Sequence, residues 1–150
     1  MRNIGAEGLQ ELIRRMIEGA GSDQEEAQRV SANLVKANLM GHDSHGVHLV
    51  PRYIVNVKNK VLQPNAHITV ESDLGAILQL NGNMGYGQII GAEAMELGIS
   101  RAKETGVSIV ALRYSHHLGR IGAWGEMCAA AGMISIHYVN VIGHHPLVSP

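Results

Sequence analysis

Residues 41–48 concentrate side chains that can exchange protons or bind a metal ion. Their sequence is Gly-His-Asp-Ser-His-Gly-Val-His, and the polar members are His42, Asp43, Ser44, His45 and His48. Farther along the chain, residues 115–120 read Ser-His-His-Leu-Gly-Arg and contain His116, His117 and Arg120. Both histidine clusters lie beside glycines at the boundaries of expected helices and strands. We therefore predict that the first cluster (residues 41–48) and the second cluster (residues 115–120) meet in one site.

Metal binding is one chemistry that the first cluster could support. Its histidines are three residues apart, Asp43 adds a carboxylate, and zinc sites with three protein ligands are known. On a regular helix, however, this spacing turns the outer two histidines about 120° apart. Gly46 also interrupts a helix, and the spacing matches no standard zinc motif. We predict that the site holds no metal.

Acid–base catalysis suits these histidines better than metal binding does. Histidine titrates near neutrality, so it can donate or accept a proton where a carbonyl becomes an alcohol. His117 is expected just ahead of a helix whose first N–H groups could bind a substrate carboxylate. Arg52 or Arg120 could bind the same carboxylate through two hydrogen bonds, and Ser44 could bind another substrate oxygen. For any single histidine, a purely structural hydrogen bond remains an open interpretation.

The glycine-rich segment 85–91 resembles a dinucleotide-binding turn, because it lies between an expected strand and an expected helix. In such turns glycines let a pyrophosphate approach a helix N-terminus, and the next strand ends in an acidic residue that binds the ribose. Here the next strand ends at Arg113, which would instead favour a phosphorylated cofactor. A tight turn packed against the sheet is the simpler interpretation.

Composition argues against several classes of function. The 150 residues carry a formal charge of -1, which gives no reason to expect nucleic acid or an anionic membrane as partner. The single cysteine, Cys128, excludes an intrachain disulfide and a cysteine metal cluster. We find neither a signal-peptide pattern nor the roughly twenty apolar residues of a membrane span. These features predict a cytoplasmic protein.

Apolar periodicity predicts the elements that position the two clusters. One helix ends at residues 19–21, and a second begins with Ser22 as N-cap and Glu25 as its capping-box partner and runs to about Leu39. A third helix is predicted over residues 47–59, with Pro51 near its start. The later elements are strands at 67–70, 77–80, 107–112 and 134–139, and helices at 88–103 and from about 120 to 131.

This order of elements predicts an α/β (α+β) fold in two parts. Residues 1–70 are expected to form a helical N-terminal subdomain that carries the first cluster. Residues 71–150 alternate strand and helix, which by itself favours a parallel sheet. The apolar end, residues 147–150, has neither a closing helix nor a polar tail, so we expect this sheet domain to continue beyond it.

Several motifs resemble those of the malate/L-lactate dehydrogenase-like (type 2) oxidoreductases. Residues 37–47, Ala-Asn-Leu-Met-Gly-His-Asp-Ser-His-Gly-Val, are followed by Pro51-Arg52-Tyr53 as in that family. Residues 85–88 and 115–122 match further motifs in the same order. The resemblance extends to the bacterial hydroxycarboxylate dehydrogenases of the family, which share the doubled histidine and the Gly-Arg-Ile-Gly after it.

The resemblance implies interconversion of 2-hydroxy and 2-oxo acids by a homodimer that uses NAD or NADP. It implies a non-Rossmann fold with a largely antiparallel sheet flanked by helices, which makes the glycine-rich segment a turn. His117 and His45 match the histidines of proton transfer and substrate binding, and Asn140 matches the approach to the nicotinamide. The residues assigned to substrate binding are Ser44, His48, Arg52, His116 and Arg120.

Two departures from the family pattern affect these expectations. Many members carry an arginine where this chain has Leu49, so the carboxylate must be bound by Arg52, Arg120, His48 or the partner subunit. Family members are also much longer, and most of their cofactor contacts lie beyond the part matched here. The alternative is a short non-catalytic module of the same fold that binds a ligand or mediates dimerisation.

Overall fold

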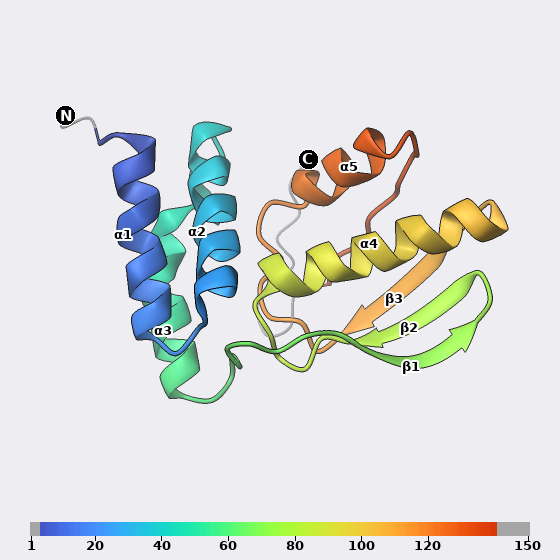
Figure 1. Cartoon of the computed structure of the whole chain (residues 1–150), viewed down its shortest axis with the longest axis horizontal. Coiled ribbons are helices and arrows are strands. Elements are labelled where there is room, and N and C mark those ends of the chain that lie inside the picture. The colour runs from blue at the N-terminus through green and yellow to red at the C-terminus, as the bar shows by residue number, and fades with distance from the viewer. Residues whose placement is uncertain (1–3, 141–150) are drawn as a thin grey trace.

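The computed structural model describes residues 4–140, which form three helices beside a three-stranded sheet that carries two further helices (Figure 1). The helices are α1 (Ala6–Gly19), α2 (Gln24–Leu39), α3 (Val50–Lys58), α4 (Gly87–Thr105) and α5 (Gly122–Ala130). The strands are β1 (Thr69–Leu74), β2 (Ile77–Asn81) and β3 (Ile109–Arg113). The chain end at 147–150 lies outside the described residues. Among the described helices, none is long and apolar enough to cross a membrane.

The start of α2 differs from the prediction by one residue. The N-cap is Asp23, whose carboxylate accepts a hydrogen bond of 2.8 Å from the backbone N–H of Glu26. Ser22 is buried instead, and its hydroxyl donates to the Glu26 carboxylate at 2.6 Å. The predicted capping box of Ser22 and Glu25 is therefore wrong. Aspartate one residue later caps the same helix and adds a negative charge near its N-terminus.

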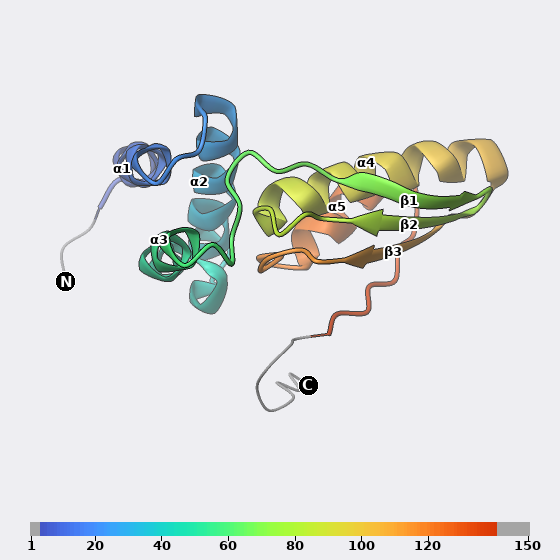
Figure 2. The same cartoon turned by 90° about the horizontal axis from the view of Figure 1, so that it is seen from below.

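Two hydrophobic cores hold the elements together. The first joins α1, α2 and α3 to the start of α4, and Tyr53 and Tyr86 are its largest members. The second, built on Leu78, Leu80 and Ala94, fixes α4 along one face of the sheet (Figure 2). Because α4 contributes to both hydrophobic cores, it connects the three N-terminal helices to the sheet.

The sheet is mixed, with strand order β1-β2-β3. Strands β1 and β2 pair antiparallel through a tight turn at Gly75, whereas β2 and β3 pair in parallel. A two-residue connection can only join antiparallel neighbours, while α4 supplies the crossover that a parallel pair needs. The α/β class is confirmed. The alternation after residue 70 favoured parallel strands, and β2 and β3 pair in this way, whereas β1, which the alternation did not include, pairs antiparallel.

The strand predicted at residues 134–139 is absent from the described structure, and this prediction is wrong. The segment is extended but unpaired, and Ile134 and Tyr138 are 98% and 92% exposed. A β-strand needs backbone partners on a neighbouring strand. Within residues 4–140, no strand pairs with this segment. The alternation of apolar residues is typical of an extended backbone, but a strand also requires hydrogen bonds to a neighbouring strand.

Candidate active site

The first histidine cluster lies on two short 3₁₀ turns, η1 (Asp43–His45) and η2 (Val47–Leu49). Gly46 separates the turns in an extended backbone conformation. Helix α3 begins at Val50, with Pro51 in its first turn, where a missing N–H leaves no intrahelical hydrogen bond unmade. The helix start predicted at residue 47 is therefore three residues too early. As a result, the cluster projects from turns and not from one helix face.

Asn38, in the last turn of α2, fixes the first cluster. Its Oδ1 accepts a hydrogen bond of 2.8 Å from the Val47 N–H, and its Nδ2 donates to Asp43 Oδ1 at 2.5 Å. A Cβ on Gly46 would lie 2.1 Å from Asn38 Oδ1, so this approach requires glycine. Sequence reasoning assigned Asn38 no role. The sequence signal that could have indicated a role is its position within the 37–47 motif, three residues before Gly41.

The second histidine cluster follows β3 and is held by the glycine-rich loop between β2 and α4. Three backbone hydrogen bonds of 2.7–3.1 Å connect the two loops, with the N–H groups of Gly82, Met84 and His116 as donors. At the start of α4, a Cβ on Gly87 would lie 2.1 Å from the carbonyl oxygen of His117. The glycines therefore let the second cluster sit directly on the N-terminus of α4.

The two clusters meet in space. The rings of His45 and His117 stack with their centroids 5.3 Å apart and their planes inclined by 30°. The Ser44 hydroxyl oxygen lies 2.9 Å from Nδ1 of His45. The prediction that the histidine clusters approach one another is confirmed, and their contact defines the candidate active site.

Tyr53, on α3, lies behind His117, and sequence reasoning gave it no role. The side chain is fully buried, and its hydroxyl lies 2.8 Å from Nδ1 of His117. Nε2 of Gln88, in the first turn of α4, donates to the same hydroxyl oxygen at 2.9 Å. The sequence signal was a tyrosine within the Pro-Arg-Tyr part of the motif. Tyr53 and Gln88 thus connect two helices to one histidine.

His116 faces α3 rather than His45. Its Nε2 lies 2.8 Å from the Asn56 amide nitrogen, which can donate to it, and its ring meets that of Tyr53 edge-on at 5.4 Å. Its Nδ1 is buried, and no hydrogen-bond partner for it exists among the residues that the structure describes. A direct substrate-binding role for His116 stays a prediction, while its packing against Tyr53 is structural.

Burial keeps the site histidines neutral. It lowers the pKa of His117 and that of His116 from 6.5 to about 4, and the positive charge of Arg52 acts in the same direction on both. Burial also lowers the pKa of His45, helped by the charges of neighbouring histidines. At neutral pH the contact therefore joins two uncharged imidazoles. An uncharged imidazole can accept a proton or donate a hydrogen bond.

The two candidate arginines differ in their surroundings. Arg120 is only 8% exposed, and its Nη2 lies 2.6 Å from a carboxylate oxygen of Glu126, which also pairs with Lys36 at 2.7 Å. Arg52 is exposed on α3, and its charge lowers the pKa of both buried histidines. Arg52 is therefore the better candidate to bind a substrate carboxylate beside the histidine contact.

The glycine-rich segment does not fit a dinucleotide. A Cβ on Gly85 would lie 2.9 Å from Ile90, and one on Gly91 would lie 2.7 Å from the Trp124 ring. Residues 86–88 at the N-terminus of α4 are buried as well, so a pyrophosphate cannot reach it. These glycines serve packing within the protein. Asn140, predicted to contact the cofactor, is exposed at the end of the described residues.

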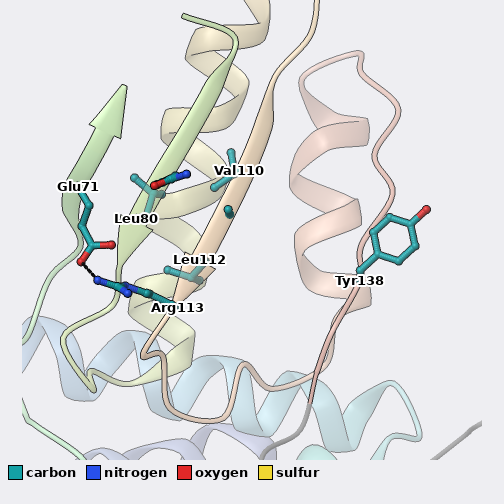
Figure 3. Close-up of a pocket in the computed structure, with 8 residues that line it drawn as sticks. Glu71, Leu80, Val110, Leu112, Arg113 and Tyr138 are labelled. Atoms are coloured by element: carbon teal, nitrogen blue, oxygen red, sulfur yellow. Dashed lines mark hydrogen bonds and ion pairs between the residues drawn. The ribbon is translucent and has the colours of Figure 1, made fainter. Parts of the chain in front are cut away.

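A shallow hollow over the open face of the sheet is separate from the histidine contact (Figure 3). It lies between β1–β3 and Tyr138, and the ion pair of Glu71 and Arg113, at 2.6 Å, forms part of its lining. None of the residues that line it belongs to either histidine cluster. Within residues 4–140, no group of three or more His, Cys, Asp or Glu side chains is arranged to hold a metal ion.

Comparisons with known sequences identify the family. Residues 4–150 match the model of the family described as malate/L-lactate dehydrogenase. Hydroxycarboxylate dehydrogenase B of Escherichia coli (strain K12) is 44% identical over 145 residues, which cover 97% of this chain and 40% of that protein. L-lactate dehydrogenase of Cupriavidus necator is 37% identical over 124 residues, which cover 83% of this chain and 36% of that protein.

Solved structures of dehydrogenases share the fold of this chain. Malate dehydrogenase from Pyrococcus horikoshii matches with a TM-score of 0.82 at 33% identity, covering 87% of this chain and 38% of its own. Sulfolactate dehydrogenase from Methanocaldococcus jannaschii matches with a TM-score of 0.79 at 33% identity, covering 83% and 36%. The chain thus spans about 40% of the length of the relatives it matches. This chain belongs to the malate/L-lactate dehydrogenase family.

Proposed function

We propose that this chain forms the substrate-binding and proton-transfer part of a 2-hydroxy acid dehydrogenase. The observation that carries the proposal is the contact between uncharged His45 and His117 beside the exposed Arg52. In oxidation, an uncharged imidazole can take the proton of a 2-hydroxyl group, and in reduction its protonated form returns it. Either histidine of the pair can serve as this acid and base.

The remaining residues are proposed to bind the substrate. The relatives named above are dehydrogenases of hydroxycarboxylates, L-lactate, malate and sulfolactate, which supports a substrate with a carboxylate next to the reacting carbon. Arg52 would bind that carboxylate, because its guanidinium can form two parallel hydrogen bonds. The other residues proposed to contact substrate are Ser44, His48, His116 and Arg120.

The cofactor, the oligomeric state and the cellular location are proposed as well. NAD or NADP, when bound, supplies the acceptor or donor of the hydride. Asn140 is proposed to approach its nicotinamide. We further propose a cytoplasmic homodimer in which residues 1–70 form the helical subdomain and residues 71–150 begin the sheet domain.

The proposed function predicts substrate-dependent oxidation of NADH or NADPH. Full-length protein should consume one of the two cofactors with at least one member of a panel of 2-oxo acids, followed by absorbance near 340 nm. Acids without the 2-oxo group should give no turnover, because the hydride has no carbonyl carbon to attack. Absence of turnover with both cofactors across the panel would favour the alternative, a non-catalytic module of this fold.

Acid is expected to destabilise the fold through His116 and His117. Burial lowers both pKa values from 6.5 to about 4, so between these pH values the unfolded chain binds protons that the folded protein does not. Each histidine should then lower the free energy of unfolding by up to about 2 kcal/mol near pH 5, and by nothing above its unfolded pKa. Urea unfolding of wild type and His117→Asn between about pH 5 and pH 7 measures this. The variant should depend less steeply on pH, and equal slopes would contradict the prediction.

A further inference from the structure

The hydrogen bonds that join Gln88, Tyr53 and His117 all donate toward His117. Nε2 of Gln88 can only donate, so at 2.9 Å it uses a lone pair of the Tyr53 oxygen. The Tyr53 hydrogen is then available for Nδ1 of His117, 2.8 Å away. Burial raises the pKa of Tyr53 to about 12, which keeps this hydrogen on the phenol at neutral pH. The order is therefore Gln88 to Tyr53 to His117.

A second donor acts on the same nitrogen. The backbone N–H of Gly119 points at Nδ1 of His117 with a distance of 3.3 Å. A nitrogen that faces two donors must be an acceptor, and the other nitrogen of a neutral imidazole then carries the hydrogen. This other nitrogen, Nε2, lies on the side of the ring away from Tyr53. The surroundings of Nδ1 thus select one of the two tautomers.

We propose that Tyr53, supported by Gln88, is a positioning residue that holds His117 as the tautomer with its hydrogen on Nε2. This proposal rests on the proposed function for its meaning in catalysis. The Nε2–H group would donate a hydrogen bond to the 2-oxo oxygen, on which negative charge grows as the neighbouring carbon is reduced. The hydrogen bond polarises the oxo group, and the proton that this oxygen gains in reduction or loses in oxidation is then exchanged with His45. Neutral histidine serves as an electrophile in this way in other enzymes.

The tautomer can be measured without substrate or cofactor. Nitrogen-15 NMR of the full-length protein, labelled at histidine, distinguishes a nitrogen that carries hydrogen from one that does not, and His117→Asn identifies the His117 signals. At neutral pH we expect hydrogen on Nε2 in the wild type and a mixture of both tautomers in Tyr53→Phe. Tyr86→Phe is the matched control, because this second buried tyrosine packs against Tyr53 at 5.7 Å and neither histidine bonds to its hydroxyl among the described contacts.

Each outcome decides the proposal. Hydrogen on Nδ1 of His117 in the wild type would overturn it whether or not Tyr53→Phe folds, and so would an unchanged tautomer in folded Tyr53→Phe. If the enzyme turns over 2-oxo acids, Tyr53→Phe should lower kcat by about 10- to 100-fold, as for other residues that orient a site histidine, while Tyr86→Phe should not. A protein without dehydrogenase activity but with hydrogen on Nε2 would refute the proposed function and leave the tautomer assignment intact.

Discussion

Replacing His117 with asparagine is expected to lower kcat for both oxidation and reduction by roughly 100- to 1,000-fold, the usual contribution of one hydrogen-bond donor to an oxygen that gains negative charge. Asparagine places an amide near the position of Nδ1 and can keep the hydrogen bond to Tyr53. It lacks the second ring nitrogen, which is the one that can face a substrate. KM should change much less than kcat, because Arg52 is left to bind the carboxylate. Steady-state kinetics with a reactive 2-oxo acid measures the effect.

A surface histidine gives the control for this experiment. His67 is exposed and pairs with Glu93 at 2.5 Å, on the segment that leads into β1. His67→Asn should keep wild-type kcat, since an exposed ion pair contributes little to stability and this one lies outside both histidine clusters. Full kcat in His117→Asn would remove His117 from the reaction. Equal losses in both variants would point to a general effect on folding.

A methyl group on Gly87 is expected to damage the fold and the site together. The Cβ would lie 2.1 Å from the carbonyl oxygen of His117 and 2.6 Å from Cα of Leu118, both backbone atoms that cannot rotate away. Gly87→Ala must therefore displace either the start of α4 or the loop that carries His117. We expect the free energy of unfolding to fall by about 3 kcal/mol, in the upper range for overpacking. Urea unfolding measures the loss.

Gly125 provides the matched control within another helix. It lies inside α5, and a Cβ there would meet nothing within 4 Å. Gly125→Ala should therefore stabilise the protein by about 0.5–1 kcal/mol, because alanine loses less backbone entropy in a helix. A Gly87→Ala variant as stable as wild type would contradict the close packing of α4 against the second histidine cluster, residues 115–120. If both variants lost stability equally, the loss in Gly87→Ala could not be assigned to its close backbone contacts.

Local patterns predicted most elements of the chain. The first two helices, the helix after the glycine-rich loop and the strand before it all follow from apolar spacing and glycine positions, which report burial within one or two turns. Glycine at 106 ends α4 in the left-handed conformation, as its position indicates. Errors occurred at boundaries, where two residues can serve the same purpose: Asp23 caps α2 although Ser22 also could.

The candidate site was predicted in part. Two histidine clusters, each beside glycines, indicated that His45 and His117 belong together, and the stacked rings agree with that inference. Tyr53 and Gln88 were not found, because their partners lie 64 and 35 positions away in the sequence. No periodicity connects residues so far apart. Arg120 posed the same problem, since its pairing with Glu126 and burial under α5 depend on how that helix packs.

By itself, the sequence determined which side chains are available for chemistry, the family, and the order of helices and strands. These depend on residue types and on spacing along one element. Only the tertiary structure decided that β1 pairs antiparallel, that residues 134–139 find no strand partner within residues 4–140, and that Tyr53 lies behind His117. The physical reason is that pairing and side-chain contact between distant segments depend on backbone hydrogen bonds and packing across elements, which local sequence does not encode.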